Sequence, residues 1–301
     1  MSASDPAPVT DLARYSQCAQ DSAARVISAY STSFGMAARL LDRRIRPHVR
    51  NVYGLVRVAD EIVDGAAAEA GLDATALGEL LDGLEAETLR AIELGYSANL
   101  VVHAFGGTAR YAGIGSDLVT PFFDSMRRDL DPRAYQSGEI GSYIYGSAEV
   151  VGLMCLRIFL ADQVVADDER TRLEEGARRL GAAFQKVNFL RDLAADWQML
   201  GRNYFPDIDP NGLTESQKLQ LVDDIDADLA AARAVIPDLP RGARGAVAAA
   251  HGLFAALNDR IRATPAERLM RSRVRVTSGA KLRILAEASL GGVTAQVRSI
   301  A

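Results

Sequence analysis

Apolar residues recur along most of this chain at the three- and four-residue spacing that places them on one face of an α-helix. The run of Val52, Leu55, Val56, Ala59 and Val63 is one example. No segment shows the two-residue alternation of a half-buried strand. Alanine, the strongest helix former, is very abundant, whereas aromatic residues make up only 6% of the chain. The sequence therefore predicts an all-α protein.

Helical stretches follow one another without a glycine-serine linker or an internal repeat. With 301 residues and 49% hydrophobic content, the chain could form one large domain or two small ones. We expect a disordered N-terminus over residues 1–12 and a single domain over 13–301. The glycines at 106–107 and 113–115 are expected to interrupt the middle of the chain. The predicted helices cover residues 11–29, 31–41, 47–63, 77–92, 143–160, 168–197, 214–236, 242–262 and a segment from 278.

Several classes of protein are excluded by what the chain lacks. Its two cysteines, Cys18 and Cys155, are too few for a disulfide framework or a cysteine zinc site. The first residues lack the basic and apolar regions of a signal peptide, and no run of about 18 apolar residues predicts a membrane span. The net charge of -5 argues against nucleic-acid binding. No HExxH zinc motif is formed by His48, His103 and His251. We therefore expect a soluble, cytoplasmic protein.

The segment 57–64 carries carboxylates where a helix does not favour them. Asp60 and Asp64 are four residues apart, so they lie on one helix face. Like charges at this spacing destabilise a helix by roughly a few tenths of a kcal/mol, and aspartate is a poor residue for a helix interior. Arg57, three residues before Asp60, could neutralise part of this charge.

A second polar stripe lies in the segment 181–196. Asn188, Asp192 and Asp196 follow one another at four-residue intervals, and Gln185 extends the stripe by one turn. The other faces of this predicted helix are mostly apolar. A polar stripe on such a helix is expected to face an internal cavity.

A single pair of carboxylates four residues apart usually forms a solvated surface. Two such groups on separate apolar helices instead indicate a cation site, because Mg²⁺ prefers carboxylate oxygens and keeps open positions for water and phosphate. We therefore expect Mg²⁺, with Mn²⁺ as a substitute, to bind a diphosphate between the two helices. A deep apolar pocket among the helices would hold a long hydrocarbon tail.

Five separated segments, in this order, resemble the motifs of the squalene/phytoene synthase family of head-to-head prenyl transferases. The resemblance extends from about residue 30 to 285 and is strongest to the bacterial carotenoid enzymes of the family. It implies a single-domain helical bundle of the isoprenoid synthase type with a central active-site cavity. The five segments are residues 30–34, 57–64, 143–152, 181–196 and 201–206.

The resemblance also implies roles for individual residues. The family's catalytic tyrosine falls at Tyr143, and the catalytic carboxylates are Asp60, Asp64 and Asp192. The metal ligands would be Asp60, Asp64, Asn188, Asp192 and Asp196. The substrate-binding residues would be Ser31, Ser33, Phe34, Arg57, Gln185, Arg191, Tyr204, Arg273 and Lys281. The chain departs from common family residues in the pocket wall at Glu149 and Phe254, which leaves the length of the substrate chain open.

The implied reaction joins two molecules of geranylgeranyl diphosphate head to head, through a cyclopropylcarbinyl (prephytoene) diphosphate, to give phytoene and diphosphate. NADPH is not expected. Two alternatives remain: a squalene or dehydrosqualene synthase that uses farnesyl diphosphate, and a non-catalytic helical protein that binds isoprenoids. Because the product is an insoluble hydrocarbon, we also expect peripheral association with a membrane surface, helped by the basic residues between 268 and 283.

Overall fold

The computed structural model describes residues 10–31, 33–131, 135, 138–200, 204 and 212–289, with the side chains of residues 33, 194–200 and 289 outside the description. Within these ranges every regular element is helical, which confirms the predicted all-α class. The predicted N-terminal segment lies mostly outside the described residues. The first helix, α1 (Asp11–Tyr30), begins where the Thr10 hydroxyl accepts a hydrogen bond from the backbone N–H of Ala13 at 3.1 Å.

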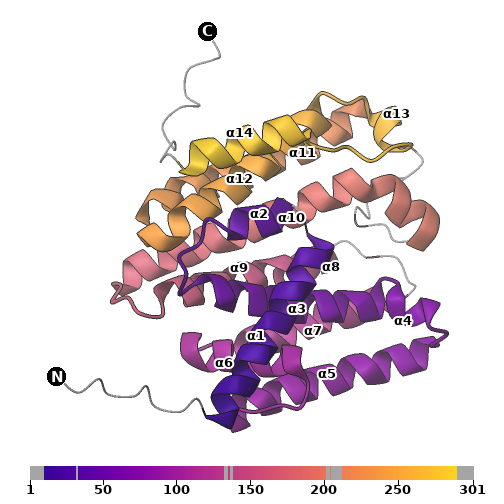
Figure 1. Ribbon diagram of the computed structural model, residues 1–301. Helices are drawn as coiled ribbons and strands as arrows, with labels where there is room; N and C mark the ends of the chain where they lie inside the picture. Colours follow the sequence, from indigo (N-terminus) through magenta and orange to yellow (C-terminus); the bar gives the residue numbers. More distant parts are fainter. Residues whose placement is uncertain are drawn as a thin grey trace.

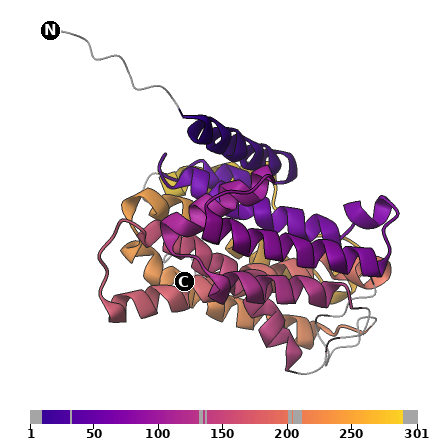
Figure 2. The same ribbon diagram turned by 90° about the horizontal axis from the view of Figure 1, so that it is seen from below.

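The helices form two groups with a long helix between them (Figure 1). One group, drawn from indigo to magenta, contains α1, α3 (Arg46–Val63), α4 (Ala66–Glu69), α5 (Ala74–Leu94), α6 (Leu100–Ala112) and α7 (Ser116–Asp129). The middle of the molecule is formed by α8 (Glu139–Ile144), the π-helix η1 (Tyr145–Glu149), α9 (Val150–Leu160) and α10 (Asp167–Leu200). The other group contains α11 (Glu215–Val235), η2 (Ile236–Asp238), α12 (Arg241–Arg262), α13 (Ala266–Leu269) and α14 (Ser278–Ser289). The short helix α2 (Ser33–Ala38) packs mainly against α12 of this group. Figure 2 shows α1 on the outside of the first group.

Two apolar cores hold these groups together. The larger core contains Phe105, Phe122 and Phe123, none more than 1% exposed, and joins α3, α5, α6, α7 and α9. The second core joins α10, α11 and α12 around Leu190 and Ile225. Removing such apolar side chains from water stabilises the folded state by about 25 cal/mol for each Å² of apolar surface that is buried. The fold is therefore stabilised mainly by burial of the apolar helix faces that the residue spacing predicted.

The expected interruption at Gly106 and Gly107 is wrong, because both residues lie inside α6. A Cβ atom on Gly106 would lie only 3.1 Å from the Cβ atom of Ala91, so this glycine allows α6 to pack closely on α5. Gly113 does end α6, in the left-handed conformation with φ of 66°. Glycine marks close helix contact at one of these positions and a helix end at the other.

A glycine also allows the π-helical turn η1 to pack on α7. A Cβ atom on Gly146 would collide with the backbone carbonyl of Pro121 and the hydroxyl of Ser125. We expect Gly146→Ala to lower the free energy of unfolding by about 1–3 kcal/mol, measured by urea denaturation. Gly141→Ala in α8 is the matched control, since nothing lies within 4 Å of its Cβ position. The control should be neutral or more stable by up to about 1 kcal/mol. Equal stability of the two variants would contradict this packing argument.

The segment Glu139–Leu160 is long and apolar enough to cross a membrane by length and composition. In the fold, half of it is buried inside the protein. Its one acidic residue near the middle, Glu149, pairs with Arg178 of α10 at 2.7 Å, and α9 contributes Val150, Met154 and Ile158 to the larger core. In this fold the segment forms the consecutive helices α8, η1 and α9 in the middle of the molecule.

Candidate active site

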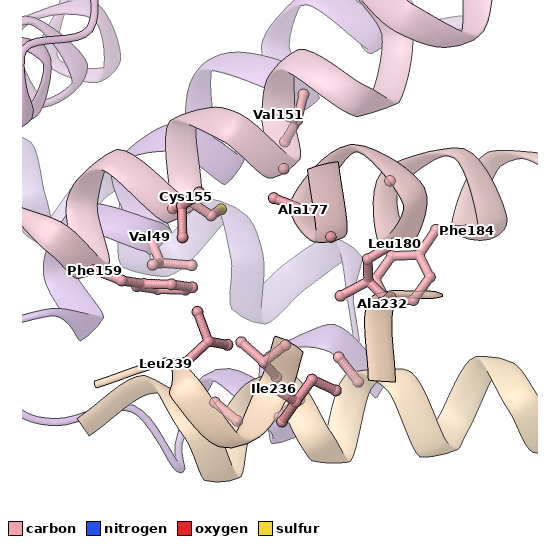
Figure 3. A pocket seen from close by; sticks show the side chains of 18 of the residues that line it. Val49, Val151, Cys155, Phe159, Ala177, Leu180, Phe184, Ala232, Ile236 and Leu239 are labelled. Atoms are coloured by element: carbon pink, nitrogen blue, oxygen red, sulfur yellow. The ribbon is translucent and has the colours of Figure 1, made fainter. Parts of the chain in front are cut away.

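A cavity of about 240 Å³ lies between the two groups of helices, with walls from α2, α3, η1, α9, α10, α11, η2 and α12 (Figure 3). Ser147 and Cys155 supply the only heteroatoms among the lining side chains that the structure describes. Burial raises the pKa of the Cys155 thiol to about 12, so this group stays neutral. The Ser147 hydroxyl is buried without a hydrogen-bond partner among the described residues. The interior therefore suits a hydrocarbon.

One end of this cavity lies beside both predicted carboxylate groups. Val56 lines the cavity one helical turn before Asp60 on α3, and Phe184 lines it one turn before Asn188 on α10. Leu173, also in the wall, precedes Asn188 by 15 positions, which is about 22 Å along the helix at 1.5 Å per residue. The labelled side chains in Figure 3 extend from Phe184 to Phe159 and Leu239, so the cavity is elongated.

The carboxylates of α3 lie in a strongly negative environment. Burial of Asp60, together with the charges of Asp64 and Asp129, raises the pKa of its carboxyl to about 8, although Arg57 opposes this rise. The Arg57 guanidinium lies 3.9 Å from Asp60, pairs with Glu61, and lies 4.3 Å from the centre of the Tyr30 ring. A cation bound here would remove the repulsion between these carboxylates.

The predicted catalytic tyrosine lies in an aromatic cluster. Tyr143 is 5% exposed and packs against Tyr204 and Phe189, with ring centroids at 5.6 and 6.1 Å. Its hydroxyl donates a hydrogen bond to Asp129 at 2.9 Å. Burial, followed by the charge of Asp129, raises the pKa of Tyr143 well above its ordinary value, so the phenol stays protonated. The structure thus brings Tyr143 and Tyr204 together, as the sequence motifs implied.

On α10 the Asp192 carboxylate is engaged by two arginines. Arg273 approaches it at 2.7 Å, and the neighbouring Arg191 also pairs with it. The amide oxygen of Asn188 is buried and has no hydrogen-bond partner among the described residues. The side chain of Asp196 lies outside the described residues. Arg191 and Arg273, both predicted to bind phosphate, are therefore held beside a predicted metal ligand.

Three predicted substrate-binding residues lie where α1 leads into α2. The Ser31 hydroxyl accepts a hydrogen bond from the backbone N–H of Phe34 at 3.2 Å. Phe34 lines the cavity and stacks on Tyr53 of α3, with ring centroids 6.0 Å apart. Ser33 begins α2, and its side chain lies outside the described residues. Of the two other predicted contacts, both partly buried, one lies on α10 and one on α14: Gln185 and Lys281.

The side chains at this end of the cavity fit a divalent cation. Asp60 is a partly buried carboxyl, 30% exposed, among other carboxylates, and Asn188 has an unsatisfied amide oxygen. Both supply the hard oxygen ligands that Mg²⁺ prefers. Among the described side chains, no three His, Cys, Asp or Glu residues are grouped so that they could hold a metal ion. The described residues therefore show suitable ligands but not a complete ligand set.

Asp129 and Tyr135 were not identified from the sequence. Tyr135 also donates a hydrogen bond to Asp129, at 3.2 Å, and its ring lies 5.0 Å from that of Tyr143. Asp129 is the last residue of α7, where the helix dipole disfavours a carboxylate. The unfavourable position of Asp129 at a helix end could have indicated a special role. Nothing in the local sequence pattern, however, connects this residue with Tyr143 in the next helix.

Comparison with known proteins places these features in a family. The model of the squalene/phytoene synthase family matches residues 27–280. A 15-cis-phytoene synthase of Paracoccus sp. (strain N81106 / MBIC 01143) is 29% identical, covering 85% of this chain and 86% of the relative. A phytoene synthase of Pseudescherichia vulneris is 28% identical, covering 81% and 82%.

Solved structures show the same fold. A dehydrosqualene synthase in complex with a ligand matches with a TM-score of 0.73 at 21% identity, covering 93% of this chain and 99% of that one. This similarity confirms the predicted helical bundle of the isoprenoid synthase type. The family match covers the helices that line the cavity and carry the carboxylates. The chain therefore belongs to the squalene/phytoene synthase family of prenyltransferases.

Proposed function

We propose that the protein joins two molecules of geranylgeranyl diphosphate head to head to give phytoene, a step of carotenoid biosynthesis. The observation that carries this proposal is the elongated apolar cavity with carboxylates of α3 and α10 at one end. The apolar length would hold an isoprenoid tail and the charged end its diphosphate. Relatives named phytoene synthase, at 28% and 29% identity, support this product.

The charged end would use Mg²⁺ as its cofactor. The ion would be held by Asp60, Asp64, Asn188, Asp192 and Asp196. When bound, Mg²⁺ supplies positive charge that stabilises a departing diphosphate. The cationic side chains that would share this task are Arg57, Arg191, Arg273 and Lys281. Arg273 pairs with Asp192 in the structure, so it would exchange this carboxylate for a phosphate when substrate binds.

The remaining residues would control the carbocations. Loss of the first diphosphate leaves an allylic cation, which adds to a double bond of the second molecule. Loss of a proton from the resulting cation closes the cyclopropane ring of the cyclopropylcarbinyl diphosphate. After the second diphosphate leaves, rearrangement and loss of a proton give phytoene. The apolar cavity wall would exclude water from these cations. The rings of Tyr143, Phe189 and Tyr204 would stabilise positive charge, and Tyr143 would steady a cation or relay the proton.

A second candidate uses the shorter farnesyl diphosphate to make squalene or dehydrosqualene. The similarity in fold to a dehydrosqualene synthase favours keeping this alternative. A squalene synthase would require NADPH as reductant, whereas our proposal requires none. A non-catalytic protein that binds isoprenoids would share the cavity but have no use for the carboxylates.

Identification of the product separates these functions. Purified protein is incubated with Mg²⁺ and either the C15 or the C20 diphosphate, with and without NADPH, and the hydrocarbon is identified by mass spectrometry. Phytoene formed from C20 without NADPH is the expected result. A C30 product alone would show that the enzyme uses farnesyl diphosphate. No turnover with either substrate would favour the binding protein.

We propose that the protein is cytoplasmic and associates with the membrane surface to release its product. Six basic residues and no acidic residue lie in the stretch from 268 to 283, and they are Arg268, Arg271, Arg273, Arg275, Lys281 and Arg283. Five of the six are exposed, and only Lys281 is partly buried. Each basic residue near an anionic membrane surface contributes about 1 kcal/mol. We expect the protein to sediment with vesicles that contain anionic lipid and not with neutral vesicles. Equal recovery with both kinds of vesicle would contradict this attraction.

A further inference from the structure

Asp129 occupies a position where a carboxylate needs specific partners. It is the last residue of α7, and the carbonyl end of a helix carries partial negative charge. Two buried tyrosines compensate for this: Tyr143 donates to Oδ2 at 2.9 Å and Tyr135 donates to Oδ1 at 3.2 Å. Both tyrosines are 5% exposed. One carboxylate therefore holds two phenols through separate oxygens.

The cluster lies against the proposed reaction site. The Tyr143 ring lies 6.1 Å from that of Phe189, the neighbour on α10 of the predicted metal ligand Asn188. In agreement, the charge of Asp129 contributes to the raised pKa of Asp60. On the other side, Tyr143 is one helical turn before Ser147, which lines the apolar cavity. Tyr143 and its partner therefore lie beside the boundary between the charged end and the hydrocarbon wall, where the proposed function would place the reacting carbons of a substrate.

The hydrogen bond to Asp129 determines whether the Tyr143 hydroxyl can act as a donor or only as an acceptor toward a substrate. A phenol has one O–H donor and two lone pairs, and the donor is occupied by Asp129. A bond to a charged acceptor is stronger than a neutral one and increases the negative charge on the phenol oxygen. Only the lone pairs remain available to other groups, and lone pairs aimed at a developing positive charge stabilise it.

We propose that Asp129 is a positioning residue that fixes the direction of the Tyr143 hydroxyl, so that its oxygen presents lone pairs and not its proton to the reacting carbocation. This inference rests on the proposed function. Tyr135 donates to the second carboxylate oxygen, and its ring packs edge-on against Tyr143 and at a tilt against Tyr204, which keeps the carboxylate in place. Asp129 acts through Tyr143 and does not itself contact the substrate.

The test is a double-mutant cycle on phytoene formation. Asp129→Asn keeps the size of the side chain and is expected to lower kcat on the order of tenfold to a hundredfold, with KM unchanged. Tyr143→Phe should have a similar effect, and adding Asp129→Asn to it should cause no further loss. Tyr111→Phe is the matched control, because it removes a tyrosine-to-aspartate hydrogen bond between exposed residues, from Tyr111 to Asp162 at 2.8 Å, and should change kcat by less than about twofold.

Two kinetic results would overturn the proposal. The first is that Asp129→Asn lowers kcat by the same factor in the wild type and in Tyr143→Phe, which would mean that Asp129 acts independently of the Tyr143 hydroxyl. The second is a requirement for more Mg²⁺ in Asp129→Asn, which would mean that Asp129 binds the metal.

A spectroscopic measurement tests the hydrogen bond without turnover. In protein labelled with ¹³C at the tyrosine Cζ atoms, the Tyr143 signal is assigned by its absence in Tyr143→Phe. We expect Asp129→Asn to shift this signal, because the charged acceptor is lost. If the wild-type protein makes no phytoene, the proposed function fails while this measurement still stands. If it makes phytoene and the signal does not move in Asp129→Asn, the positioning role alone is wrong.

Discussion

Asp60→Ala and Asp192→Ala are each expected to reduce phytoene formation by more than about a thousandfold. Each change removes a proposed ligand of an ion that contributes several kcal/mol to stabilising the departing diphosphate, and about 1.4 kcal/mol corresponds to a factor of ten in rate. Turnover is measured with C20 diphosphate and saturating Mg²⁺. Asp168→Ala is the matched control, since this exposed aspartate lies on α10 far from the cavity's charged end.

The folded state of the Asp60 variants provides a second measurement on the same residue. Folding raises the pKa of Asp60 from 3.8 to about 8, so between these values the native carboxyl keeps a proton that the unfolded one has lost. Its stabilising contribution is complete below about pH 4 and is lost as the pH rises to about 8. In EDTA, Asp60→Asn should therefore gain stability over the wild type as the pH rises, measured by urea denaturation.

These results together separate loss of function from loss of fold. If Asp60→Asn is also inactive and is more stable than the wild type at pH 8, its inactivity cannot be due to unfolding. Full activity of either Asp60→Ala or Asp192→Ala would refute the metal assignment. A stability difference that does not grow with pH would contradict the raised pKa of Asp60.

Ala232→Phe is expected to lower the preference for C20 over C15 diphosphate by about a hundredfold or more. Ala232 lines the cavity from α11 (Figure 3). Its position along the cavity follows from the contacts of α11 with α10. Asp228 pairs with Arg179 at 3.0 Å, and Val235 packs against Gly176. A phenyl ring there would block the cavity about halfway between Phe184 and Leu173. The longer substrate loses more apolar contact, at about 0.8 kcal/mol for each buried CH₂ group over one extra isoprene unit.

The matched control is Ala231→Phe, which adds the same ring to the exposed face of the same helix. It should leave the ratio of kcat/KM for the two substrates unchanged. Circular dichroism of both variants checks that the helices remain. Equal loss of activity on both substrates in folded Ala232→Phe, or unchanged use of the C20 substrate, would show that this cavity does not hold the isoprenoid tail.

The sequence predicted most of the long helices because burial of one apolar face follows a regular spacing, but it did not predict α6 or α7. The segment predicted at 168–197 corresponds to α10 (Asp167–Leu200), and Thr214 caps α11 as an N-terminal threonine should. Gly106 was misread because a glycine that ends a helix and one that permits close packing look alike without the partner helix. The π-helical turn at Tyr145 could not be predicted either, since it depends on contacts with α7.

The candidate site was predictable where its residues share a helix. Asn188 and Asp192 could be connected by spacing alone, and the structure places them on α10 beside the cavity. The hydrogen bond from Tyr143 to Asp129 could not be found in this way, because it joins two helices through the fold. The pairing of Asp192 with Arg273 likewise brings together residues 81 positions apart.

A competition between substrates tests the central claim most directly. The protein is incubated with Mg²⁺, without NADPH, and with equal amounts of the C15 and C20 diphosphates, and the hydrocarbon products are quantified by mass spectrometry. If a deep apolar cavity and a diphosphate site at its mouth make this enzyme a phytoene synthase, the C40 hydrocarbon phytoene will predominate. Predominance of a C30 hydrocarbon, or the absence of any hydrocarbon product, would contradict the account.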